Sequence, residues 1–367
     1  MKKIILTIML ITSVFIATGC GKHSEEEIKA SFTKEVEKIK SYYLEGTMSL
    51  MNNDDVYNYN VKVSFTKDNK YKVSLINQNN NYEQIILKND EGVYVITPSL
   101  NKSFKFQSDW PNNNSQSYLL DSVAKDLKNS KDCKFELKND EYIYQIEANY
   151  PNNPNIKSQN IILDKDGNLK KVEVQDKNGI SYITFTVTKL DKKATFGNDY
   201  YELETITKDF TENKSDNNLP NKDTNDETNN KTEQKGNTNE QNPAEESKET
   251  NATIDETLFP LYIPSNTSLT NREVINIEGG ERVIMTFSGD NPFMLVQETA
   301  KKEEELTIIP TYGEPYLLID TVGSLTDVSY TWTSNGIEYY IVSDVLNQNE
   351  ILEIAKSINV VATINEK

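Results

Sequence analysis

Few side chains in this sequence are suited to act as a nucleophile, a general base or a metal ligand. The 367 residues include one histidine, His23, and two cysteines, Cys20 and Cys133. Serine and cysteine hydrolases need a histidine inside a folded site, whereas His23 lies close to the N-terminus. We also find no nucleophile elbow, P-loop or dinucleotide-binding fingerprint. The sequence therefore predicts a protein that is not an enzyme and that uses no cofactor and no metal ion.

Two acidic stretches have the residue types of a cation site, but each has a simpler structural interpretation. Asp164-Lys165-Asp166-Gly167 resembles the start of a calcium-binding loop, although the later ligands and the final glutamate of such a loop are missing from the sequence. We expect this stretch to form a hairpin turn. We expect the run Glu303–Glu305 to lie on the solvated surface.

Acidic residues outnumber basic ones by 57 to 39, which gives a formal net charge of -18. Proteins that bind nucleic acid cluster lysine and arginine against the phosphates, so this composition argues against a nucleic-acid partner. The excess is uneven, because residues 254–367 contain 18 acidic and 6 basic residues, whereas residues 24–210 contain 29 and 25. The acidic C-terminal segment favours a basic partner, with solubility as the simpler interpretation.

The first twenty residues have the order of a targeting signal. The basic pair Lys2-Lys3 precedes the apolar run Ile4–Ile16, and small residues stand directly before Cys20. This order resembles a bacterial lipoprotein signal, in which the cysteine receives a diacylglyceryl group and becomes the mature N-terminus. We expect residues 1–19 to be a signal peptide and residues 20–23 a tether that anchors the protein to the extracytoplasmic face of the cell membrane through lipidated Cys20. An uncleaved anchor and an ordinary signal peptide are the alternatives.

Residues 24–210 are predicted to form helices packed on an antiparallel sheet. Ser24 and Glu27 have the spacing of a capping box, and apolar residues at helical spacing continue to Tyr43, so we expect a first helix of about 20 residues. A second helix is expected over 115–129. Alternating apolar and polar residues separated by turn signals predict an antiparallel meander between and after these helices. The expected strands span 57–65, 71–75, 82–88, 92–97, 102–107, 133–138, 141–149, 157–164, 168–175 and 180–189.

The composition changes near residue 211 and again near residue 254. Residues 211–253 contain almost no apolar side chains and cannot bury enough surface to offset the entropy of ordering, so we expect a disordered acidic linker. Residues 254–367 are expected to form a small α+β domain. Its expected strands span 273–278, 281–287, 293–298, 316–320, 328–333 and 337–342, with a final helix over 348–359 that Asn347 and Glu350 cap.

Residues 87–127 contain a distinctive series of turns and strands. Asn89-Asp90-Glu91-Gly92 precedes Val93-Tyr94-Val95, and Pro98-Ser99-Leu100-Asn101 follows. Pro98 ends strand pairing, Asn101 suits a turn, and Ser115 is placed to cap the next helix. The stretch is similar to the sporulation and germination lipoproteins of spore-forming Gram-positive bacteria, the YdcC-like and GerS-like proteins. These resemble a wider group with the fold of LolA, the outer-membrane lipoprotein carrier.

This resemblance implies an incomplete antiparallel β-barrel that wraps helices and leaves an apolar concavity. The germination lipoproteins act through protein partners, notably a peptidoglycan amidase. By that resemblance the chain is a non-enzymatic, membrane-anchored lipoprotein that works in sporulation or spore germination by binding an extracytoplasmic protein. The lipoprotein carrier holds acyl chains in its concavity, which implies the alternative function, a carrier or binder of lipid.

The aromatic and apolar residues of the sheet allow two interpretations. They form either a plain core beneath the helices or an apolar groove for a ligand or partner. The residues that we expect to line this groove or to contact the helix are Phe104, Phe106, Trp110, Leu119 and Val123.

Overall fold

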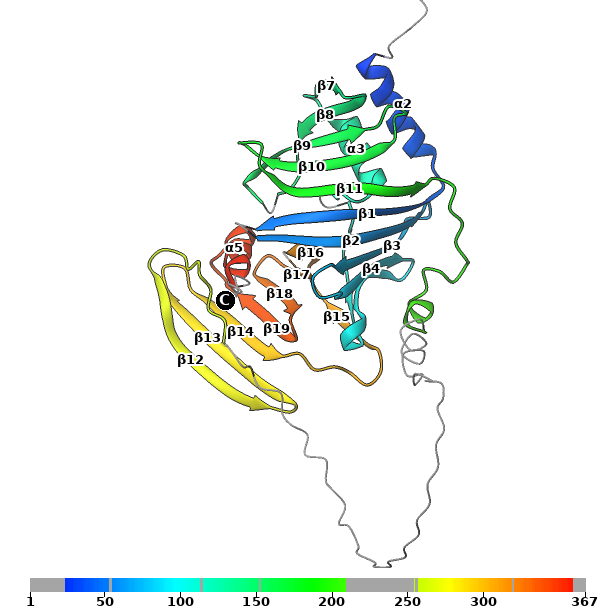
Figure 1. Ribbon diagram of the computed structural model, residues 1–367. Coiled ribbons are helices and arrows are strands. Elements are labelled where there is room, and N and C mark those ends of the chain that lie inside the picture. Colours follow the sequence, from blue (N-terminus) through cyan, green and yellow to red (C-terminus); the bar gives the residue numbers. More distant parts are fainter. Residues whose placement is uncertain are drawn as a thin grey trace, which may run out of the picture.

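Two large β-sheets, with helices packed against them, make up the fold (Figure 1). The computed structural model describes residues 24–52, 55–112, 115–151, 153–208, 254, 257–318 and 320–358. The predicted signal peptide, tether and linker lie outside the described residues. Within the described part, the structure confirms the predicted fold class, which is mostly β with packed helices and an unclosed sheet of mainly antiparallel strands.

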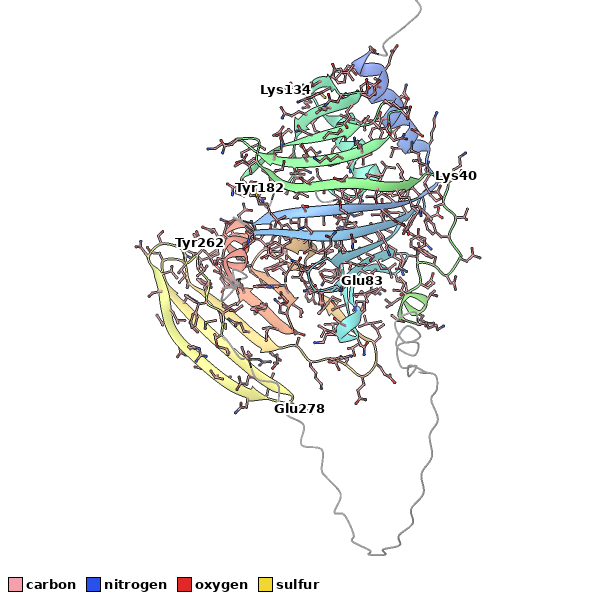
Figure 2. The ribbon with its side chains drawn as sticks, viewed as in Figure 1. Lys40, Glu83, Lys134, Tyr182, Tyr262 and Glu278 are labelled. Atoms are coloured by element: carbon pink, nitrogen blue, oxygen red, sulfur yellow. The ribbon has the colours of Figure 1, made fainter. Side chains whose placement is uncertain are left out.

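The larger sheet, sheet A, has twelve strands in the order β15-β6-β5-β4-β3-β2-β1-β11-β10-β9-β8-β7. Neighbouring strands pair antiparallel except β15 and β6, which are parallel. The strands are β1 (Ser41–Asn52), β2 (Asp55–Thr66), β3 (Lys70–Asn77), β4 (Glu83–Asn89), β5 (Gly92–Thr97), β6 (Lys102–Phe106), β7 (Lys134–Lys138), β8 (Glu141–Glu147), β9 (Ile156–Leu163), β10 (Leu169–Asp176), β11 (Ser181–Asp191) and β15 (Thr307–Thr311). Lys134, at the start of β7, lies at the far end of the sheet in Figure 2.

The smaller sheet, sheet B, is formed by the C-terminal segment in the order β12-β13-β14-β19-β18-β17-β16. Helix α5 (Gln348–Ile358) packs on β18 and β19 and buries Ile351, Ile354 and Ala355. The predicted cap is confirmed, because the Glu350 amide donates to Asn347 Oδ1 at 3.2 Å and the Asn347 amide donates to Glu350 Oε2 at 3.0 Å. The strands are β12 (Thr267–Ile277), β13 (Gly280–Gly289), β14 (Phe293–Thr299), β16 (Glu314–Leu318), β17 (Thr321–Leu325), β18 (Ser329–Ser334) and β19 (Ile337–Val342).

Helix α2 (Glu25–Lys38) begins at the predicted capping box and ends earlier than predicted. Ser24 Oγ accepts a hydrogen bond from the Glu27 amide at 3.3 Å, and Glu27 Oε2 accepts one from the Ser24 amide at 2.9 Å. Ile39 already has an extended backbone, and alternate residues from Tyr42 onward are buried as part of β1. The predicted helix to Tyr43 was wrong because Tyr43, the last apolar residue of its stripe, belongs to this strand.

Helix α3 (Leu120–Asn129) is also shorter than predicted. Its N-cap is Leu119, which makes no side-chain capping bond, so Ser115 does not cap the helix. Residues 115–119 instead form the loop that directly precedes the helix. Helices α2 and α3 contact each other, and their apolar sides join one core with sheet A (Figure 1).

Asp121 attaches α3 to the sheet. Its carboxylate accepts hydrogen bonds from the Tyr42 hydroxyl on β1 at 2.9 Å and from the Tyr71 hydroxyl on β3 at 2.7 Å. Both tyrosines are almost completely buried. Burial, reinforced by the negative charge of Asp121, raises the pKa of both phenols above the usual value. The hydroxyls therefore stay protonated and act as donors to the helix.

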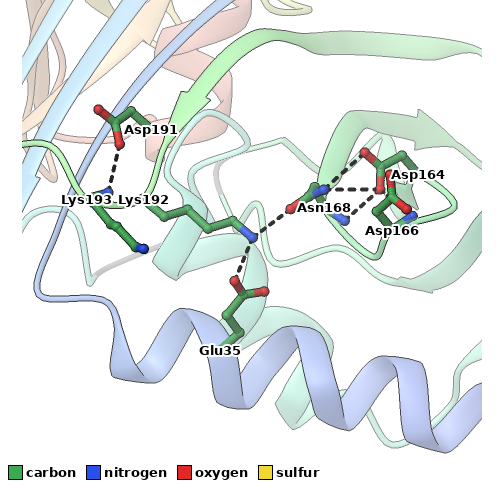
Figure 3. Close-up of polar contacts among 7 residues, drawn as sticks. All are labelled: Glu35, Asp164, Asp166, Asn168, Asp191, Lys192 and Lys193. Carbon is green, nitrogen blue, oxygen red and sulfur yellow. Dashed lines mark hydrogen bonds and ion pairs between the residues drawn. The ribbon is translucent and has the colours of Figure 1, made fainter.

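The predicted turn at Asp164–Gly167 joins β9 to β10 and connects to helix α2 (Figure 3). Asp164 Oδ1 accepts the backbone amides of Asp166 and Asn168, each at 2.9 Å, which is the usual role of an aspartate in a turn. Lys192 Nζ donates to Asn168 Oδ1 at 2.6 Å and to Glu35 Oε1 on α2 at 2.8 Å. This contact bridges the sheet and the helix at the surface.

The sequence did not predict β1, β15 and β17. Strand β1 was assigned in part to the preceding helix. Strand β15 contains Pro310, which suits an edge strand because proline has no amide to donate. Strand β17 contains Gly323, where a side chain would lie 2.4 Å from the Thr331 carbonyl oxygen and 2.6 Å from the Tyr330 hydroxyl. Strands β15 and β17 have five residues each, which is too short for a clear alternation of apolar and polar residues. Their strand structure therefore depends on contacts with residues distant in the sequence.

We predict that Asp121→Ala lowers the free energy of unfolding by about 2 kcal/mol or more, because two buried phenols lose their acceptor. Urea denaturation followed by circular dichroism measures the change. Lys125→Ala, an exposed substitution on the same helix, is the control and should change stability by less than about 0.5 kcal/mol. Equal stability of the two variants would contradict the assigned role of Asp121.

Candidate binding cavities between the two sheets

The C-terminal segment is joined to sheet A by a parallel strand pair and by polar side chains. Strand β15 extends the β6 edge in a register that places Ile309 beside Phe104. On β4, Gln84 is buried and bonds β17 through both ends of its amide. Its Oε1 accepts from the Val322 amide at 2.6 Å and from Thr321 Oγ1 at 3.1 Å, and its Nε2 donates to the Val322 carbonyl at 3.2 Å. The two sheets therefore form one continuous structure.

Three further polar contacts cross the same boundary. Lys102, whose side chain is 8 % exposed, forms an ion pair with Glu338. Ser108 donates a hydrogen bond to Glu314, whose pKa is raised by burial. Asn101 Nδ2 donates to the Glu303 carbonyl at 2.6 Å. The buried Lys102 ammonium specifies one arrangement of the sheets, since displacing it from Glu338 would leave a buried charge unpaired.

The larger cavity, about 370 Å³, lies between β5, β6 and β15 of sheet A and β17–β19 of sheet B. Phe104 and Phe106, two of the predicted groove residues, line it together with Ile309, Val322 and Trp332. The Trp332 indole nitrogen is buried and has no hydrogen-bond partner among the described residues. The walls also carry polar side chains, among them Gln84, Thr331 and Glu338, so the cavity suits a mainly apolar ligand with a few polar groups.

The other three predicted groove residues lie elsewhere. Trp110 lines a smaller cavity of about 210 Å³, and its ring meets Tyr71 edge-on at 5.6 Å between centroids. Its carbonyl accepts a hydrogen bond from Lys88 Nζ at 2.5 Å. Leu119 and Val123 are buried in the core between α3 and sheet A and line neither cavity. Five residues that are close in sequence are thus divided between two cavities and the core.

The residues that the C-terminal segment contributes to both cavities were not predicted from the sequence. Pro315, Tyr316 and Glu353 face the smaller cavity, and Thr331 and Tyr340 face the larger one. The alternation of residues 328–333 and 337–342 predicted strands correctly. No local signal indicates that these strands lie over a sheet formed some 200 residues earlier in the chain.

Asp320 is a partly buried acid at the turn between β16 and β17, close to the boundary of the sheets. Ser334 donates a hydrogen bond to its carboxyl group. Burial raises the pKa of Asp320, and this effect exceeds the opposing effect of the hydrogen bond. Tyr59 and Tyr330 are nearly completely buried, and their pKa values are raised mainly by burial and further by Asp320.

Comparison with characterised proteins identifies the family. The chain is 32% identical to "Sporulation protein YdcC" of Bacillus subtilis (strain 168) over 357 residues, which cover 97% of this chain and 96% of the relative. The chain belongs to the YdcC family. This match confirms the resemblance drawn from residues 87–127. No family model matches the chain.

Several solved structures show distant likenesses to this YdcC-family protein. The Pseudomonas aeruginosa MucA/MucB complex gives 10% identity, coverage of 89% of this chain and 98% of that chain, and a TM-score of 0.30. A putative outer membrane lipoprotein-sorting protein domain from Vibrio parahaemolyticus is 13% identical in sequence. The match covers 50% of this chain and 100% of that chain, with a TM-score of 0.32. A chain of the Clostridioides difficile complex of the CwlD amidase with the GerS lipoprotein is 17% identical in sequence. The match covers 48% of this chain and 98% of that chain, with a TM-score of 0.19. The family assignment therefore rests on the YdcC match.

Cys20, the predicted lipidation site, lies outside the described residues. Among the helices of the described part, none has the length and apolar character needed to cross a bilayer. The anchor therefore stays a prediction from the N-terminal sequence.

We predict that Asp320→Asn reduces the pH dependence of stability. The folded-state pKa of Asp320 lies above its unfolded value of about 3.9, so the stability that its protonated form contributes is present below about pH 4 and is lost as pH rises through the folded pKa. The variant, whose amide cannot ionise, should lose less stability than the wild-type protein as pH rises above about 4. Urea denaturation at a series of pH values measures the difference.

The exposed substitution Asp344→Asn is the control and should follow the wild-type curve. If the stability of Asp320→Asn and of the wild-type protein changed with pH in the same way, ionisation of Asp320 would not destabilise the folded state, and the prediction would be contradicted.

Proposed function

We propose that this protein is a non-enzymatic, membrane-anchored lipoprotein that acts in sporulation by binding an extracytoplasmic protein partner. Two observations support the role and the location. The chain belongs to the family of a protein named for sporulation. Its N-terminus has the basic pair, apolar run and cysteine of a lipoprotein signal.

The observation that supports protein binding most directly is an exposed apolar surface on the C-terminal segment. We call it the 259–263 surface, after the residues that form it. Phe259, Leu261, Tyr262 and Ile263 are 47%, 72%, 45% and 38% exposed. Four large apolar side chains within five consecutive residues are unusual on a surface without a partner. Tyr262 lies beside α5 in Figure 2, and the Leu261 amide donates to the Ser357 carbonyl of that helix at 3.4 Å.

The neighbouring edge of sheet B offers a second element for a protein partner. Strand β12 is the outermost strand, pairs only with β13 within the described part of the chain, and is at least partly exposed along its whole length. An edge strand presents unpaired amides and carbonyls that can bind a strand of another protein. Leu269 and Val274 on β12 are 37% and 48% exposed and add apolar contact area.

The acidic excess of residues 254–367 favours a partner with a basic face. Such binding should weaken as the salt concentration rises, because salt screens charges separated by more than about 10 Å at 0.1 M. Binding of the partner that is insensitive to salt would contradict this part of the proposal.

The larger cavity favours a second candidate function, the binding of an acyl chain. Its walls include Phe104, Phe106 and Ile309, and its volume is about 370 Å³. Native mass spectrometry of the folded Cys20→Ala protein, which carries no anchor of its own, distinguishes the two functions. Co-purified acyl ligand would support lipid binding, and repeated spectra without ligand would contradict it.

We predict that Cys20→Ala releases the protein from the membrane fraction, because the proposed anchor is the lipid on this residue. Fractionation and immunoblotting of sporulating cells measure the release. Cys133→Ala, which removes the other cysteine, should leave the protein in the membrane fraction. Unchanged membrane association of Cys20→Ala would contradict the anchor.

We predict that Leu261→Glu lowers crosslinking to the protein partner in sporulating cells about tenfold or more, because a charge would be placed in the apolar surface. Mass spectrometry of crosslinked complexes measures the yield relative to the amount of protein. Leu137→Glu is the matched control, since Leu137 is also an exposed leucine but lies on β7 at the opposite edge of sheet A. Equal yields from the two variants would contradict a role for the 259–263 surface.

A further inference from the structure

The smaller cavity combines apolar and polar walls, and it contains two buried hydroxyl groups. It lies between the ends of β1 and β11, the loop 115–118 that precedes α3, and the C-terminal elements β16 and α5. Its volume is about 210 Å³. Tyr182, at the end of β11 nearest to α5, marks its position in Figure 2. Both folded segments contribute walls, so the cavity exists only when they are packed together.

Two buried hydroxyl groups on its wall lack hydrogen-bond partners. Ser115 is 3% exposed, and neither its Oγ nor the Tyr150 hydroxyl makes a hydrogen bond with any described residue. Asp126 lies near Ser115 and Ser117 lies near Tyr150, yet neither pair has the geometry of a hydrogen bond. Because α3 starts at Leu120, Ser115 is not used as a helix cap. Buried hydroxyls without partners are costly, and a bound molecule with polar groups would satisfy them.

The remaining walls combine aliphatic side chains, among them Leu50 and Leu317, with aromatic rings and neutral amides. Trp110, Tyr182 and Tyr316 supply rings, and Asn52 and Asn155 supply amide groups. Rings match the C–H faces of a sugar, and amides bond its hydroxyls in either direction, since each amide both donates and accepts. An acyl chain would leave these polar groups unpaired.

The cavity carries no unbalanced charge. Of the described residues that line it, the charged ones are Glu353 and Lys356 on α5, and they pair with each other at 2.8 Å. An anionic or cationic ligand would therefore lose its hydration without gaining a free counter-charge. The volume also limits the size, because drug-sized ligands occupy pockets of roughly 300–1,000 Å³.

We propose that this cavity is a binding site for a neutral carbohydrate of one or two pyranose rings. The ring faces pack on the aromatic side chains, and the sugar hydroxyls bond Ser115 Oγ, the Tyr150 hydroxyl and the amides of the rim. The site uses residues different from those of the 259–263 surface, so it does not depend on the proposed protein partner.

Saturation-transfer NMR with the full-length protein in detergent solution tests the proposal. The probes are glucose, N-acetylglucosamine and their β1,4-linked disaccharides, with octanoate as an acyl probe and glucosamine as a cationic probe. We expect at least one neutral sugar to receive saturation and to be displaced by neither control probe. Ser115→Ala and Tyr150→Phe should each weaken its binding about three- to tenfold.

Tyr142→Phe, on β8, is the matched control and should bind the sugar as the wild-type protein does. A second readout requires no ligand. If the Tyr150 hydroxyl is unpaired in the free protein, Tyr150→Phe should keep or raise the midpoint of urea unfolding, whereas loss of a real hydrogen bond would lower it. The proposal is overturned if no neutral sugar binds, if octanoate competes with the sugar, or if both cavity variants bind as tightly as the control.

Discussion

The parallel pairing of β15 with β6 is the contact on which the rest of the structure depends. Sheet A has an open edge at β6, and a strand from some 200 residues further along the chain covers it. Once β15 is in place, the following strands β16 and β17 lie over the sheet, where Gln84 bonds β17 through both ends of its amide. Both cavities and the ion pair of buried Lys102 with Glu338 exist only in this arrangement.

This arrangement divides the molecule into surfaces of different character. Sheet A and its helices are closed by the chain's own C-terminal segment, which leaves two cavities of mixed apolar and polar lining rather than one wide groove. The apolar surface and the free edge strand that remain accessible lie on sheet B, in the acidic segment. A protein that works by binding would therefore present the segment farthest in sequence from the predicted membrane anchor at Cys20.

Local features were predicted well because neighbouring residues determine them. The capping boxes at Ser24 and Asn347 are present. Asn139-Asp140, between the strands predicted at 133–138 and 141–149, and Asn335-Gly336, between those predicted at 328–333 and 337–342, have the positive φ angles that such turns favour. The candidate site was predicted only in part. Phe104 and Phe106 line a cavity, whereas Leu119 and Val123, with the same apolar character, are core residues. Packing from β15–β19 separates these cases, and local sequence carries no record of it.

Hydrogen–deuterium exchange of the full-length protein tests most directly whether the C-terminal segment closes sheet A. The pairing predicts that amides of β6 and β15 are both protected and that they lose protection together as urea is added. The Thr307 amide, which donates to the Asn101 carbonyl at 2.9 Å, should belong to the same group. Rapid exchange along β15 while β1 and β11 at the centre of sheet A stay protected would contradict the account.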